Sequence, residues 1–164
     1  MDSKKILAKL RKFGKEVKKD IPSINNGGCG VYAYMMGEAL IKHGIKNVEC
    51  FNEQYFLVHS TDKYREIGES NRNKKISMYD WEDLGVEFEH IGVKFELDGV
   101  VYFHDVEQTK KNVVNNFAYG EVTHCYFDVS TIKHIASKPE GWSQVFSRRK
   151  NIPKLKKKFK EFAL

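Results

Sequence analysis

The chain has 164 residues, of which 41% are hydrophobic and 30% charged, a balance typical of one folded domain. It has no run of about 18 apolar residues and begins with a lysine-rich segment, so we expect neither a membrane-spanning helix nor a secretory signal. Three cysteines are too few for a disulfide framework, which makes the cytoplasm the expected location. We predict a single α+β domain over residues 1–164 with its core at 22–128.

The formal net charge is +6, and much of the excess lies near the two ends, at 4–19 and 148–160. Such basic ends could bind nucleic acid or another anionic surface. They could equally be the solvated faces of two terminal helices. The second interpretation is favoured, because no nucleic-acid-binding motif accompanies the charge.

Helical periodicity is clearest in the first quarter of the chain. Apolar residues from Ile6 to Val17 follow one stripe, which predicts an amphipathic helix over 3–20. Pro22 ends this pattern. A loop over 25–28 then leads into a second helix from Cys29 to about His43.

The rest of the chain predicts short strands, turns and further helices. Two strands flanking Asp98-Gly99 indicate a hairpin with a two-residue type I′ turn. The predicted strands are 48–51, 55–59, 88–97, 100–106 and 122–127; 61–75 is a predicted surface loop; and the predicted helices are 113–117, 130–136 and a basic C-terminal helix at 152–164 with Pro153 in its first turn.

Cys29 is the residue whose position most suggests chemistry. It lies where the loop Asn25-Asn26-Gly27-Gly28 becomes a helix, and an exposed helix N-terminus favours a thiolate. Gly28 and Gly30 leave room for a substrate beside the sulfur, and the Cys29 N–H could donate to an oxyanion. The competing interpretation is a buried structural cysteine, which the flanking glycines make less attractive.

A nucleophilic cysteine needs a base, and the hairpin register selects His90. With a two-residue turn, Gly92 faces Asp105 and His90 faces Glu107, so His90 and Asp105 are diagonal neighbours on one face. Asp105 is the expected orienter and Glu107 the alternative. An ordinary surface histidine with cross-strand charges remains the competing interpretation.

The other histidines fit other roles. His104 lies on the apolar face of the hairpin and is expected to be a core residue. His124 is the next candidate base, but adjacent strand residues point to opposite faces, so it does not pair with Cys125. His43 is expected to interact with the C-terminal dipole of its helix.

Two segments resemble the papain-like cysteine hydrolase superfamily. These are Asn-Gly-Gly-Cys-Gly-x-x-Ala, followed by a helix, and His90-Ile-Gly-Val with the later Tyr-Phe-His-Asp ending at Asp105. The order Cys, His, Asp is that of the superfamily, and short phage and bacterial proteins share this spacing. The resemblance covers residues 22–107. It implies a helix bearing Cys29 packed on a small antiparallel sheet, and the host cytoplasm as the location if the chain is phage-encoded.

One functional residue of papain has no counterpart in this sequence. Papain places a glutamine six residues before its cysteine as a second oxyanion donor, and Ser23 occupies that position here. Asn25 or Asn26 is the candidate substitute. The scattered cysteines lack the spacing of a zinc site, and the glycine loop lacks the Lys-Ser/Thr of a P-loop, so we expect no metal and no cofactor.

Together these observations predict a thiol-dependent hydrolase or acyl-transfer enzyme. Cys29, His90 and Asp105 would be its catalytic residues, acting on a protein or peptide substrate. The alternative is a non-catalytic protein of the same fold, such as a phage effector that binds nucleic acid or an acidic host protein through its basic termini. Neither interpretation calls for membrane association.

Overall fold

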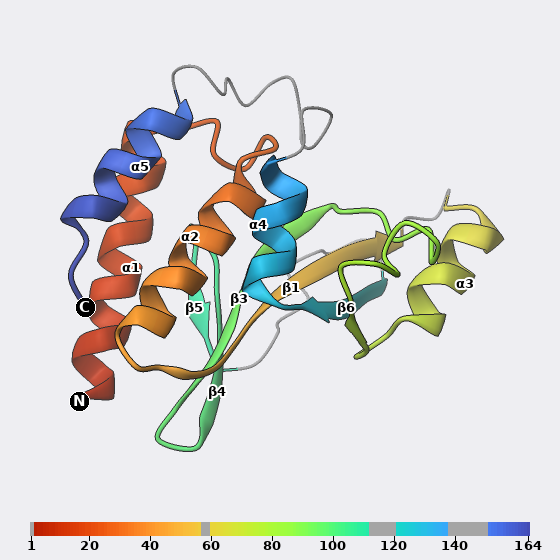
Figure 1. Cartoon of the computed structure of the whole chain (residues 1–164), viewed down its shortest axis with the longest axis horizontal. Coiled ribbons are helices and arrows are strands. Elements are labelled where there is room, and N and C mark those ends of the chain that lie inside the picture. Colours follow the sequence, from red (N-terminus) through yellow and green to blue (C-terminus); the bar gives the residue numbers. More distant parts are fainter. Residues whose placement is uncertain (1, 57–59, 112–120, 138–150) are drawn as a thin grey trace.

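The computed structural model describes residues 2–56, 60–111, 121–137 and 151–164, without the side chains of 55, 56, 121 and 122. It has the predicted α+β class, with helices grouped around one sheet (Figure 1). The helices in the described part are α1 (Ser3–Asp20), α2 (Cys29–Lys42), α3 (Asp62–Ser70), α4 (Val129–Ser137) and α5 (Asn151–Glu161); the strands are β1 (Lys46–Phe56), β2 (Lys75–Ile76), β3 (His90–Leu97), β4 (Val100–His104), β5 (Thr109–Lys110) and β6 (Glu121–Phe127).

The six strands form one sheet in the order β2-β6-β1-β3-β4-β5. Every neighbouring pair is antiparallel except β2 and β6, so the expected antiparallel sheet is instead mixed. The parallel pair involves only the two residues of β2, which follow Asn73 at a positive φ of 59°. The centre of the sheet is β1 between β6 and β3.

The predicted hairpin is confirmed at its turn and along its first five residue pairs. Asp98 and Gly99 both have positive φ, 50° and 75°, as a type I′ turn requires. The ladder runs from Leu97 opposite Val100 to Val93 opposite His104, which is the expected register. It ends there, so the expected pairs of Gly92 with Asp105 and of His90 with Glu107 do not form.

The terminal helices are part of the packed structure. Ile6, Leu10 and Val17 on α1 are buried, as the predicted stripe requires, and Leu155 of α5 is fully buried. Asp2 caps the start of α1 through its carboxylate. The helices predicted at 3–20, 29–43 and 130–136, and the basic C-terminal helix, are therefore confirmed to within a few residues.

Three local predictions differ from the structure or lie outside it. The expected loop at 61–75 contains α3, whose first turn is capped by the Thr61 hydroxyl accepting from the Tyr64 N–H. The two strands expected at 48–51 and 55–59 are one continuous strand, β1, up to Phe56. The helix predicted at 113–117 lies outside the described residues, as do 57–59.

None of the helices in the described part of the chain is both long and apolar enough to cross a membrane.

Candidate active site

Cys29 is the first residue of α2, at the predicted junction of loop and helix. Its exposed fraction is 9%, against 0% for Cys50 and 2% for Cys125, so it is the most accessible of the three free thiols. Burial raises the pKa of the Cys125 thiol to about 11 and raises that of Cys50 further. Only Cys29 lies beside a base.

The N-terminus of α2 has no side-chain cap. Asp2 and Thr61 satisfy first-turn N–H groups of α1 and α3, but Gly28 in the cap position of α2 has no side chain to do so. The first N–H groups of a helix have no partner within the helix and give its end a partial positive charge. The end of α2 that carries Cys29 is therefore suited to an anion.

His90, at the start of β3, links the thiol to a carboxylate. Its Nε2 lies 3.0 Å from Oδ2 of Asp105, and Cys29 is near enough to raise the pKa of the ring. Because Nε2 is occupied by Asp105, Nδ1 is the ring nitrogen left for the thiol. Burial alone would lower the pKa of His90, but the hydrogen bonds and charges of Asp105 and Cys29 outweigh it and raise the pKa to about 10.

Asp105 is fixed by a turn of the backbone. Its Oδ1 accepts the N–H groups of Glu107 and Gln108 at 2.7 and 2.8 Å, and its own N–H donates to the Gln108 carbonyl. Burial would raise the pKa of this carboxyl, but the bonds from His90 and these N–H groups lower it. One oxygen therefore holds the turn while the other holds the imidazole.

Glu107, the alternative orienter, lies in another network. Its carboxylate accepts from Lys18 at 2.5 Å and from the Asn25 amide at 2.8 Å. The reason is that the turn at Asp105 ends the β-ladder and directs Glu107 toward α1. The same bond holds the Asn25 amide at Glu107, so Asn26 is the remaining candidate for a side-chain oxyanion donor.

His104 is a core histidine, as predicted. It is 1% exposed, its Nε2 lies 2.8 Å from the Tyr32 hydroxyl, and its Nδ1 lies 2.9 Å from Oγ1 of Thr109. Burial lowers its pKa to about 4, so the ring is neutral near pH 7. Through Tyr32, one turn along α2 from Cys29, this network joins the thiol helix to the end of β4.

A second buried pair, which the sequence analysis did not identify, lies beside His90. Glu53 of β1 is directly opposite His90 across the strands, and its Oε1 lies 3.6 Å from Nε2 of His124 on β6. A cross-strand neighbour of β3 other than β4 cannot be identified without knowing which strands pair. His124 therefore belongs to this row of the sheet, while His43 bonds the Ala39 carbonyl at the end of α2, as expected.

Among the described residues, no group of three or more His, Cys, Asp or Glu side chains is placed to hold a metal ion. Comparison of the chain with protein-family models, with curated proteins and with solved structures gives no match.

Proposed function

We propose that the protein is a thiol-dependent hydrolase or acyl-transfer enzyme of papain-like architecture, with Cys29 as nucleophile, His90 as base and Asp105 as positioning residue. One observation carries the proposal. The His90 ring is hydrogen-bonded to Asp105 and lies beside a cysteine at an uncapped helix N-terminus. A buried structural cysteine requires none of these three features.

The arrangement supports a two-stage acyl transfer. With the Cys29 proton already held on Nδ1 of His90, the sulfur bonds to the carbonyl carbon, and the imidazolium then protonates the leaving group as its bond to that carbon breaks. Water next gives a proton to His90 and attacks the thioester, which releases the acid and restores the thiol. Asp105 holds the ring and stabilises its protonated form throughout.

The uncapped end of α2 supplies the place for the oxyanion. The Cys29 N–H is one donor at the positive end of the helix. Within the described residues the Asn26 side chain makes no hydrogen bond, so its amide is free to be the second donor. We propose a peptide or protein amide as the substrate, since the chemistry needs only a carbonyl with a leaving group.

The test is acylation of the intact chain by p-nitrophenyl acetate at about pH 6, followed by release of p-nitrophenolate and by mass spectrometry. We expect a burst of p-nitrophenolate and an acetyl group on Cys29. Replacing His90 by Ala should slow acylation about 100-fold or more, the usual contribution of a general base. Asp105→Asn should also slow it, because the amide would donate to Nε2 and leave the ring proton on Nδ1, facing the thiol.

Matched controls separate catalysis from general reactivity. Glu107→Gln tests the alternative orienter and His134→Ala removes an exposed histidine from α4, and both variants should acylate at the wild-type rate. Acetylation spread over lysines, or acylation of Cys29 that is unchanged in His90→Ala, would contradict the proposal and favour a non-catalytic protein.

A further inference from the structure

Positive charge is concentrated in α1 and α5. These two helices contain thirteen basic and three acidic side chains, whereas the rest of the chain contains fifteen basic and nineteen acidic ones. The helices therefore carry a formal charge of +10 and the remaining residues −4. The net charge of +6 is therefore very unevenly distributed between the two helices and the rest of the chain.

The two helices lie side by side although they come from opposite ends of the sequence (Figure 1). The Phe13 ring of α1 packs on Phe159 and Phe162, with centroids 4.8 and 4.3 Å apart. Lys158 pairs with Asp20 at 2.5 Å, which fixes the two helices together at one end. The basic side chains of the two helices therefore lie close together in space.

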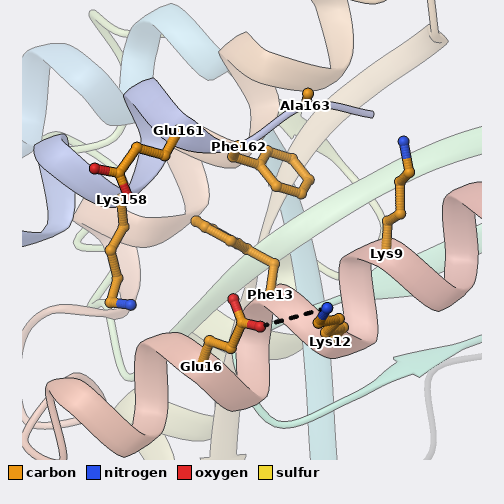
Figure 2. A pocket seen from close by; sticks show the side chains of 8 residues that line it. All are labelled: Lys9, Lys12, Phe13, Glu16, Lys158, Glu161, Phe162 and Ala163. Atoms are coloured by element: carbon orange, nitrogen blue, oxygen red, sulfur yellow. Dashed lines mark ion pairs between the residues drawn. The ribbon is translucent and has the colours of Figure 1, made fainter.

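A groove of about 290 Å³ runs between the helices. Figure 2 shows Phe13 and Phe162 within it, Lys9 and Lys12 on the α1 side and Lys158 on the α5 side. Lys12 is engaged by Glu16 at 3.9 Å. By contrast, several exposed lysines make no ion pair with any described residue; they are Lys9, Lys15 and Lys19 on α1 and Lys156, Lys157 and Lys160 on α5.

The composition of the two helices favours phosphates over a lipid surface. A helix that lies in a membrane interface inserts an apolar face, but Leu10, Val17 and Leu155 are buried in the protein core. The large exposed apolar residues of the described chain belong to other elements. Twelve of the thirteen basic residues are lysines, which act on phosphate as point charges.

We propose that α1 and α5 form a docking face for duplex nucleic acid, which binds the sugar–phosphate backbone without sequence preference. A duplex fits better than a single strand, because single-strand binders stack bases on exposed aromatic rings and the phenylalanines here pack on one another. Eighteen residues of α1 extend about 27 Å, enough to follow several phosphates. This proposal is independent of the thiol chemistry.

The test is fluorescence anisotropy of a labelled duplex DNA of about 25 base pairs titrated with the full chain at several KCl concentrations. We expect an affinity that falls steeply with salt, as counterion release requires. The triple variant Lys15→Glu, Lys19→Glu, Lys156→Glu should bind at least about tenfold more weakly and with a shallower salt dependence. These side chains are exposed, so circular dichroism should show an unchanged fold.

The matched control is Lys46→Glu, Lys63→Glu, Lys74→Glu, which makes the same change of net charge at exposed positions outside the two helices. It should retain most of the affinity. Equal weakening of both variants would overturn the proposal, because net charge alone would then explain binding. Tighter binding to the matching single strand, or binding to phosphatidylserine vesicles but not to the duplex, would also overturn it.

Discussion

At the scale of single residues, the molecule contains two histidines whose environments push their pKa values in opposite directions. His104 is buried between Tyr32 and Thr109, and its pKa falls to about 4. Burial opposes the charge of His90 as well, but its pKa rises to about 10 because Asp105 and Cys29 both favour the protonated ring. His104 is therefore neutral and has a structural role, whereas His90 in the candidate active site carries a proton.

The His90 environment predicts a pH dependence of stability. Its folded-state pKa of about 10 exceeds the value of 6.5 for a free histidine. The stabilisation is therefore complete below about pH 6.5 and is lost as the pH rises through 10, by up to about 1.4 kcal/mol per pH unit. We expect the difference in unfolding free energy between wild type and His90→Gln, measured in urea, to be largest near pH 6 and to shrink towards pH 10.

The control for this measurement is His134→Gln, an exposed histidine on α4. Its difference from wild type should stay small and nearly constant with pH. A His90→Gln difference that stayed constant above pH 7 and shrank below pH 6.5 would mean that the ring is neutral in the folded protein, and would contradict the site electrostatics described above.

At the scale of elements, the position of Asp105 depends on how closely α1 approaches the turn that holds it. A Cβ on Gly14 would lie 2.6 Å from the Val106 carbonyl oxygen, so only glycine allows this contact. In an exposed helix, Gly→Ala stabilises by about 1 kcal/mol. Here we expect Gly14→Ala to destabilise by about 1–3 kcal/mol, because the backbone of the turn would have to move.

Thermal or urea unfolding of Gly14→Ala measures this effect, with Ala8→Gly as its counterpart at an exposed position of α1. Ala8→Gly should cost about 1 kcal/mol from helix propensity alone. If Gly14→Ala proved more stable than wild type, α1 would not be held against the turn that carries Asp105.

Sequence reasoning succeeded where the determinants are local. The Asp98-Gly99 turn fixes the register of β3 and β4, and the polar loop before Cys29 marks the start of α2. It missed features set by long-range contacts, such as Glu53 beside His90 and the bond that holds Asn25 at Glu107. It also missed α3, because most residues of this helix are polar and the segment therefore resembled a surface loop, although Thr61 caps its first turn.

At the scale of the whole molecule, the two ends of the chain close on one aromatic cluster. Phe13 contacts Phe159 and Phe162, and Phe159 in turn lies 5.6 Å, between ring centroids, from Tyr32 of the thiol helix. Both basic helices are therefore connected to the core that positions Cys29. Such continuity predicts that the chain unfolds as one unit rather than as a core with two separable extensions.

Phe13→Ala tests this cooperativity. Phe13 is 6% exposed, so its truncation should lower the free energy of unfolding by about 3–5 kcal/mol, and Phe13→Leu should lower it less because part of the cavity stays filled. Far-UV circular dichroism and tryptophan fluorescence, followed through urea unfolding, should give coincident single transitions in all three proteins. An early loss of helical signal while fluorescence is unchanged would instead show that α1 and α5 detach independently, and the basic face would then be only loosely coupled to the site.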